Sequence, residues 1–355
     1  MDVALIALVV LWFALIVYAC LGGADFGAGA WDLFAVGRDA VRQRRLVNHA
    51  LGPVWEANHV WLIFLIVGLF NVFPYAFYAL SIALFFPFTI VLIGIVLRGA
   101  AFIYRYYALD EGSVFARTWS RVFSASSVIT PFFLGVSAAA VASGKLVGSS
   151  GIPRATNMTP FLSPFVLVIG LMAVSLCATL AAIYLLVEAS MTEDDEQFIT
   201  SYRIKALVSG AITAVLGALG LFFSISDAPD IWNGMLSHAL PVVIATMIIG
   251  TVTAIVLFRR RYRLARIFMI TETAFLLGSW GLSQYPYIIP RYYTIDNSAN
   301  DPNVIITLLI AILIGMLILI PSLYYLFSVF KLSYPAPGLR HNEQQRQPEA
   351  RHNTN

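Results

Sequence analysis

Residues 3–21 read VALIALVVLWFALIVYACL, a run of 19 positions without a charged side chain. A helix rises about 1.5 Å per residue, so about 20 apolar residues span the hydrocarbon core of a bilayer. Eight more apolar stretches follow, and none has the polar and apolar alternation of barrel strands. We therefore predict an all-α integral membrane protein with about nine transmembrane helices, over residues 3–21, 53–70, 75–97, 122–142, 161–187, 206–225, 235–258, 267–289 and 303–330.

The composition of the whole chain agrees with a membrane protein. Of its 355 residues, 59% are apolar and 12% are charged, whereas an ordinary soluble domain has about 45–50% and about 25%. A water-soluble enzyme is thereby excluded. Residues 1–332 are predicted to form a single helix bundle, with two four-helix bundles and a peripheral ninth helix as an alternative arrangement. Residues 333–355, rich in Gln, Asn, Pro and Arg, are predicted to be a disordered cytoplasmic tail.

Basic residues are distributed unevenly between the two sides that nine spans define. Of 22 Lys and Arg residues, 19 fall on one side, and only Lys145, Arg154 and Arg291 fall on the other. Cytoplasmic loops collect positive charge, so we predict an external N-terminus and a cytoplasmic C-terminus. Five arginines between residues 259 and 266 lie on the predicted cytoplasmic side. Anionic lipid headgroups are a simpler partner for them than nucleic acid.

The second apolar stretch begins with the densest group of polar side chains near the membrane, GPVWEANHVW at residues 52–61. At about 100° per residue, Glu56 and His59 lie within about 60° of each other, while Asn58 and Trp61 project from roughly the opposite side. A desolvated carboxyl group takes up protons more readily, so Glu56 is a candidate for proton transfer. The alternative is a helix-end carboxylate stabilised by the helix dipole.

Two interpretations of residues 52–61 as a metal site have less support than proton transfer. Glu56 and His59 spell Glu-x-x-His, but a di-iron site needs a second such motif, and the chain has none. His59 is a candidate haem ligand, although a hydrogen-bonded packing histidine is the simpler interpretation. We therefore assign no metal or haem to this chain.

Three further ionisable residues stand in or beside apolar stretches, where such groups are costly and often functional. Asp25 lies in GGADFGAG at residues 22–29, whose small residues allow close helix packing, and it is placed to face Glu56 across a helix pair. Arg98 is either an anchor that reaches the interface or the counter-ion of such carboxylates. Glu272 is either a third proton-transfer candidate or an interfacial acid paired with a loop arginine.

At these residues the chain resembles subunit II of the cytochrome bd quinol oxidases, over roughly residues 1–330. The block around Trp55 is the most specific motif. The resemblance implies nine spans, a multi-pass location in the bacterial inner membrane and a haem-bearing partner, subunit I, with small single-helix subunits as further partners. The motifs that carry it are Gly23-x-Asp25-x-Gly27-x-Gly29, residues 52–62, Leu97-Arg98-Gly99-x-x-Phe102-x-x-Arg105, and Tyr285-Pro286-Tyr287-Ile288-x-Pro290.

The resemblance also implies the activity and the cofactors. Subunit I would carry haem b and haem d, or haem b only, and would oxidise quinol, while the complex reduces dioxygen to water with cytoplasmic protons. Glu56 and Asp25 match family acids implicated in a proton route or in its structure. The expected supporting residues are Trp55, Asn58, His59, Trp61 and Arg98.

Two departures from the family pattern bear on that route. Many members have an acid where Gly22 stands, and commonly one where Ile103 stands. A proton path through this chain is therefore expected to be shortened, rerouted or absent. The alternative function is an ion- or proton-coupled transporter that uses Glu56, Asp25 and Glu272 as coupling sites. A purely structural membrane scaffold is the third.

Overall fold

The computed structural model describes the chain except residues 1, 36–38, 107–113, 149–157, 193–194 and 334–355. The predicted tail therefore lies almost wholly outside the described residues. Inside helices, the description also omits the side chains of residues 39–41, 45, 48–49, 51–57, 105–106, 326–327 and 329–333.

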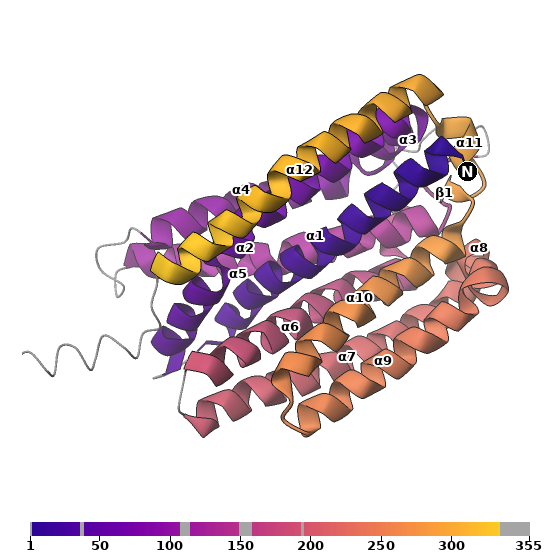
Figure 1. Ribbon diagram of the computed structural model, residues 1–355. Helices are drawn as coiled ribbons and strands as arrows, with labels where there is room; N and C mark the ends of the chain where they lie inside the picture. Colours follow the sequence, from indigo (N-terminus) through magenta and orange to yellow (C-terminus); the bar gives the residue numbers. More distant parts are fainter. Residues whose placement is uncertain (1, 36–38, 107–113, 149–157, 193–194, 334–355) are drawn as a thin grey trace, which may run out of the picture.

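Nine helices of at least 19 residues dominate the described chain (Figure 1). They are α1 (Val3–Leu33), α2 (Asp39–Val72), α4 (Phe85–Tyr106), α5 (Val114–Ala142), α6 (Pro164–Thr192), α7 (Glu196–Asp227), α9 (Leu240–Phe258), α10 (Tyr262–Gln284) and α12 (Pro302–Ser333). The shorter elements are α3 (Pro74–Ala83), η1 (Thr159–Leu162), α8 (Pro229–Gly234), the π-helical η2 (Met235–Ala239), α11 (Ile295–Ser298) and the antiparallel strands β1 (Tyr287–Ile289) and β2 (Tyr293–Thr294). The predicted all-α membrane architecture is confirmed.

Seven helices of the described residues are long and apolar enough to cross a membrane, or eight if α2 and α3 form one bent span. The ninth long helix, α10, is not among them, and its sequence includes Arg263, Arg266 and Glu272 beside several Ser, Thr and Gly residues. It nevertheless packs along α9 and α6. The number of long helices thus agrees with the prediction, and the orientation of the bundle stays a prediction.

The predicted span at 75–97 is wrong in its boundaries, because two helices share that stretch. Helix α3 is bent by 120° from α2 after residue 72 and ends at Ala83, and the long helix α4 begins only at Phe85. Pro74 opens α3, where its missing N–H costs nothing. Pro87 cannot donate to the carbonyl of Ala83, and its ring crowds that carbonyl, so a helix does not continue unbroken across this point.

Helix α1 lies at the centre of the bundle, where it contacts α2, α5, α6, α10 and α12 (Figure 1). Every residue from 22 to 30 is buried. A Cβ atom on Gly27 would overlap the carbonyl oxygen of Cys177 in α6, and one on Gly23 would meet the side chain of Leu180. The predicted role of these glycines in close helix approach is therefore confirmed for α1 and α6.

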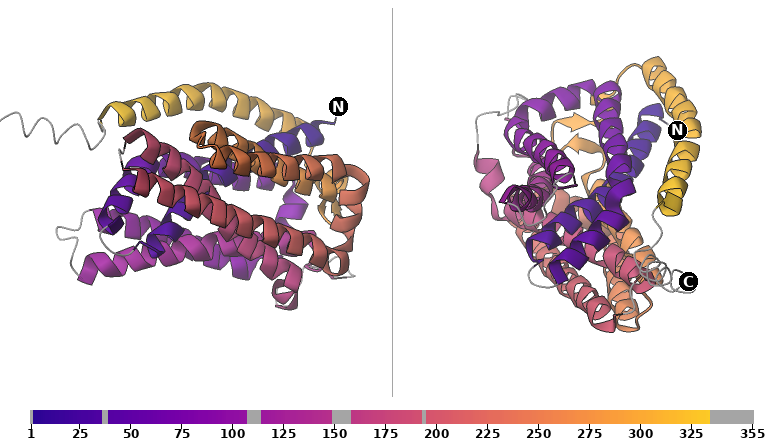
Figure 2. Two further views of the ribbon diagram at one scale, coloured as in Figure 1. Left: turned by 90° about the horizontal axis from the view of Figure 1, so that it is seen from below. Right: turned by 90° about the vertical axis from the view of Figure 1, so that its left-hand side faces the viewer.

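Helix α12 lies at the periphery of the bundle, as the yellow helix of Figure 2 shows in both views. It packs against α1 and α2, and most of its side chains are exposed, including Leu317 and Ile318. Lipid or another subunit must cover this apolar face. Whether the remaining helices form one bundle or two stays a prediction.

Aspartate side chains cap the first turns of two long helices. Asp2 accepts a hydrogen bond from the N–H of Ala4 (3.1 Å), and Asp195 accepts from the N–H groups of Gln197 (2.9 Å) and Phe198 (3.3 Å). Such caps satisfy backbone donors that a helix leaves unpaired. A hydrogen bond from Arg42 (2.7 Å), followed by these backbone bonds, holds the pKa of the exposed Asp195 carboxyl below its ordinary value. The hydrogen bond from Arg42 also joins α2 to the start of α7.

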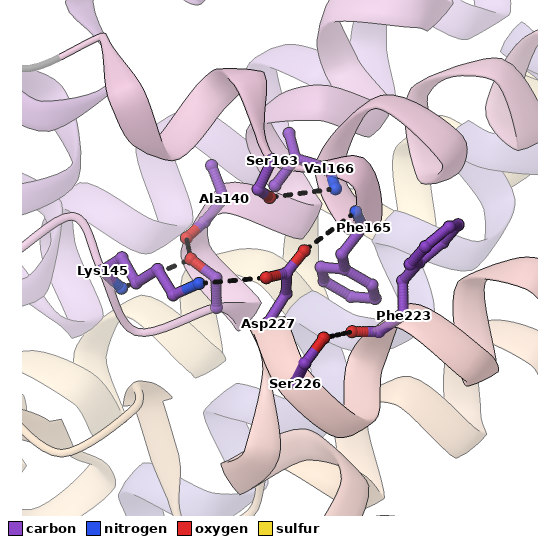
Figure 3. A network of polar contacts seen from close by, with 9 residues as sticks. Ala140, Lys145, Ser163, Phe165, Val166, Phe223, Ser226 and Asp227 are labelled. Atoms are coloured by element: carbon purple, nitrogen blue, oxygen red, sulfur yellow. Dashed lines mark hydrogen bonds and ion pairs between the residues drawn. The ribbon is translucent and has the colours of Figure 1, made fainter.

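Asp227 ties three segments together at the end of α7 (Figure 3). One carboxylate oxygen accepts a hydrogen bond from the backbone N–H of Phe165 in α6 (3.3 Å), and the other lies 3.4 Å from Lys145 Nζ. Lys145 is 46% exposed, so its ion pair contributes little. The hydrogen bond from the first turn of α6 to Asp227 therefore contributes more to the stability of the fold than the ion pair does.

We expect Asp227→Ala to lower the free energy of unfolding by about 1–2 kcal/mol, because a helix-end N–H loses its charged acceptor. Asp227→Asn keeps an acceptor oxygen and should cost about half as much. Thermal denaturation of the purified protein would measure both. Equal losses in the two variants would assign the stability to charge instead of to the hydrogen bond.

Candidate functional site

A buried ion pair joins α1 to α4. Arg98 Nη1 lies 2.5 Å from Asp25 Oδ2, and Arg98 Nη2 lies 2.7 Å from Asp25 Oδ1. Nη2 also donates to the backbone carbonyl of Asp25 (2.9 Å). Both residues are 3% exposed. The guanidinium therefore donates two parallel hydrogen bonds to the carboxylate. This bidentate geometry is the strongest arrangement of an arginine–carboxylate ion pair.

The rest of the guanidinium is also enclosed. Arg98 Nε donates to Ser127 Oγ in α5 (2.9 Å). The rings of Phe26 and Phe123 lie 5.0 Å and 4.7 Å from the guanidinium carbon, within range of cation–π attraction. Of the two roles left open for Arg98, the structure favours the counter-ion over the interfacial anchor.

A small cavity with room for about one water molecule adjoins this pair. Its walls include two side-chain atoms, Tyr18 Oη and Asn58 Oδ1, that are fully buried and have no hydrogen-bond partner among the described residues. Unpaired buried polar atoms are costly, so they mark a place where water or a proton-carrying group is expected. The cavity is lined by Tyr18, Asp25, Phe26, Asn58, His59, Leu62, Ile95 and Arg98.

The predicted residues of α2 are only partly described. The side chains of Glu56 and Trp55 lie outside the described residues, although the backbone at both positions belongs to α2. Asn58 and Trp61 are buried, at 3% and 9% exposure. Asn58 lines the same cavity as His59, although helix periodicity placed it on roughly the opposite side of α2 from Glu56 and His59. His59 is half-buried beside the cavity. A cavity of this size does not fit a porphyrin, so no step through a haem on His59 is derived.

Glu272 belongs to a different part of the bundle. It lies between α10 and α9, where its Oε2 accepts a hydrogen bond from Thr253 Oγ1 (3.2 Å) and its carboxyl group fills the space beside Gly250. No hydrogen bond or ion pair within the described part of the chain connects it with Asp25. The alternative interpretation of Glu272, pairing with a loop arginine, is likewise not seen among those residues.

Asp32 forms a second acid–arginine contact at the C-terminal end of α1. Its carboxylate accepts from Arg44 Nε (2.9 Å) and lies 3.5 Å from Ser124 Oγ. Asp32 is 5% exposed. The two buried acids of α1 thus both hold an arginine of another helix, and together they fix the packing of α1 against α2, α4 and α5.

Sequence reasoning did not single out Tyr18 or Ser127. Tyr18 precedes Asp25 by seven residues, or about two turns, so a period-3.6 reading places both on one face of α1. That spacing was a usable signal for Tyr18. Ser127 has no such signal, because its contact with Arg98 depends on how α4 and α5 pack.

The two departures from the family pattern have different surroundings. A Cβ atom on Gly22 would lie 2.9 Å from Asn58 Oδ1. Ile103, in contrast, is 48% exposed on α4. An acid at position 22 would therefore enter the wall of the cavity, whereas one at position 103 would lie on the outer face of the chain.

Long apolar helices around a buried acid–arginine pair define a polytopic membrane protein whose polar centre lies between helices. The chain belongs to the family of cytochrome bd terminal oxidase subunit II, whose sequence pattern matches residues 3–330. It is thus a subunit of a bd-type terminal oxidase and a multi-pass protein of the bacterial inner membrane. This membership supports the oxidase interpretation over the transporter alternative.

Individual relatives agree with the family assignment. A Bacillus subtilis protein described as a cytochrome bd menaquinol oxidase subunit II is 23% identical over 337 residues, covering 92% of this chain and 95% of that protein. The Escherichia coli K12 cytochrome bd-I ubiquinol oxidase subunit 2 is 28% identical over 181 residues, covering 48% and 45%. The solved bd oxidase of Geobacillus thermodenitrificans contains a chain with a similar fold, with a TM-score of 0.78, 24% identity and coverage of 94% of this chain and 100% of that one.

Proposed function

We propose that this chain is the accessory subunit of a quinol:dioxygen oxidoreductase whose haem-bearing partner, subunit I, oxidises quinol and reduces dioxygen to water. Membership of the subunit II family supports this proposal. The chain itself has only five histidines, and too few of them lie near the membrane to hold several haems. Haem b and haem d, or haem b only, would therefore be bound by the partner.

The observation that carries a more specific role is the buried pair of Asp25 and Arg98 beside a water-sized cavity. Both carboxylate oxygens of Asp25 already accept hydrogen bonds from Arg98. A carboxylate held in this way is a fixed part of a polar path and not its mobile proton carrier. Tyr18 and Asn58 supply the groups to which a water in the cavity would bind.

Glu56 is the proposed mobile acid of this path. It precedes Asn58 by two residues and His59 by three on α2, and both of these residues line the cavity. Residues three apart on a helix share a face. A carboxyl group one turn from His59 would therefore deliver protons toward the cavity, from the side on which the arginines are concentrated.

Glu56→Gln is expected to slow quinol-driven oxygen consumption per haem by about 10-fold or more, because an amide cannot pass on a proton. The measurement uses the purified oxidase complex, with haem content read from its reduced-minus-oxidised spectrum. Glu272→Gln is the matched control, since it removes another membrane carboxyl that has no described link to the cavity.

Three outcomes separate the possibilities. Full turnover with full haem content in Glu56→Gln would remove Glu56 from the path. Lost haem would assign it to assembly instead. Equal slowing of oxygen consumption in both variants would show that the proton path also includes Glu272 of α10. Purification of the chain as a stable, haem-free protein without a partner would contradict the accessory-subunit role itself.

A further inference from the structure

The turn between α9 and α10 carries five arginines within eight positions: Arg259, Arg260, Arg261, Arg263 and Arg266. We infer that this turn is a binding site for the headgroup phosphate of an anionic phospholipid. The site would hold one leaflet's lipid against the peripheral α9–α10 hairpin. It is separate from the cavity beside Asp25, because that cavity is lined by residues of α1, α2 and α4.

The arginines are available to an external anion. Arg259, Arg260, Arg261 and Arg263 are all exposed. Among the residues that the structure describes, no hydrogen bond or ion pair involves the side chain of Arg259 or Arg261. Arg263 donates to the sulfur of Met191 (3.6 Å), which is a weak acceptor. Several exposed guanidinium groups therefore have no strong partner among the described residues.

Within the described residues, one acid forms an ion pair with the cluster. Glu196 Oε2 lies 3.3 Å from Arg260 Nη1, and the two side chains are 71% and 56% exposed. Exposed pairs of this kind contribute little and are readily exchanged for another anion. Arg266 is held differently, because its guanidinium stacks 5.7 Å from the ring of Tyr184. Arg266 is thus held against the protein, whereas Arg259 and Arg261 are the arginines that would contact the headgroup.

Apolar side chains beside the arginines favour a lipid over a soluble anion or an acidic protein. Phe258 is 68% exposed at the end of α9, and Leu264 and Ile267 are 40% and 59% exposed at the start of α10. Arginines next to exposed apolar groups match the two parts of a phospholipid, a charged headgroup above acyl chains. An inorganic phosphate would gain nothing from these apolar neighbours.

The test uses the purified oxidase complex in nanodiscs that contain a photoreactive phosphatidylglycerol, with phosphatidylcholine of the same photoreactive design as the neutral comparison. We expect illumination to label residues 258–267 from phosphatidylglycerol. The double variant Arg259→Gln/Arg261→Gln should reduce this labelling about 25-fold, given roughly fivefold for each of the two arginines from headgroup attraction. Higher salt should reduce it as well.

Arg117→Gln/Arg121→Gln is the matched control. It removes the same charge from two exposed arginines of α5, on the same predicted side of the membrane, and should leave labelling of residues 258–267 unchanged. Equal labelling by the phosphatidylcholine probe, or an equal loss in the control variant, would overturn the proposal. Displacement of the lipid probe by inorganic phosphate would also overturn it, since the site would then bind free anions. Haem content verifies that each variant complex is folded.

Discussion

Arg98→Met is expected to remove most of the assembled oxidase from the membrane. The substitution leaves the Asp25 carboxylate buried without its two guanidinium hydrogen bonds. Breaking a buried ion pair from one side costs about 3–5 kcal/mol, a large part of the about 5–15 kcal/mol that a folded protein has in total. The amount of this chain in membranes, together with the haem absorbance of the purified complex, measures the loss.

The double variant Asp25→Asn/Arg98→Met provides the control for this prediction. It removes both charges, so no unpaired ion stays in the bundle, and uncharged replacements of a buried pair are often tolerated. We expect assembly to recover substantially relative to Arg98→Met. If the single variant assembles like the wild type, the pair does not stabilise the fold.

The same double variant separates structure from function. Should the pair only hold α1 against α4, the recovered complex would consume oxygen at the wild-type rate per haem. If it forms part of a polar path, the recovered complex would assemble and yet turn over slowly. The comparison therefore tests the role proposed for Asp25 independently of its contribution to folding.

Gly27→Ala is the second substitution with a large expected effect. The added Cβ atom would overlap the backbone carbonyl oxygen of Cys177, and backbone cannot rotate away as a flexible side chain does. Overpacking of a tight helix contact typically costs about 1–3 kcal/mol, and we expect the upper part of this range or more. The yield of complex and its thermal midpoint measure the effect.

Gly278→Ala is the matched control for Gly27→Ala. It makes the same chemical change within the long helix α10, where nothing lies within 4 Å of the added Cβ atom. Because alanine favours helices over glycine, this variant should be neutral or slightly stabilised. A similar loss in both variants would show that glycine itself, and not the approach of α1 to α6, is what the bundle requires.

Apolar length predicted most of the fold. The nine long helices follow the nine apolar stretches because a bilayer requires about 20 such residues for each crossing. The same measure misplaced the third helix, since Leu84 and Pro87 stand among apolar residues and no polar loop marks the break between α3 and α4. Hydropathy records how apolar a segment is, whereas proline determines where its direction changes.

Helix periodicity predicted only which residues of the site share a face within one helix, and not how the helices pack against one another. Asp25, Asn58, His59 and Arg98 meet around one cavity, although periodicity had placed Asn58 and His59 on different sides of α2. The choice between two roles for Arg98 was open in the sequence, because Asp25 and Arg98 are 73 positions apart, and no spacing rule links separate helices. Glu272 looked equivalent to Asp25 by composition, but the packing of α9 and α10 gives it a different neighbourhood.

The contact between Gly22 and Asn58 makes these two positions interdependent. A side chain larger than hydrogen at position 22 would press on the Asn58 amide, whose oxygen already has no described partner. The amide nitrogen lies 3.1 Å from the same Cβ position, so a turned amide would donate a hydrogen bond to a carboxylate there. Grafting the acid that other members carry at position 22 into this chain should thus succeed only while residue 58 keeps its amide, and a combined Asn58→Leu substitution should remove that tolerance.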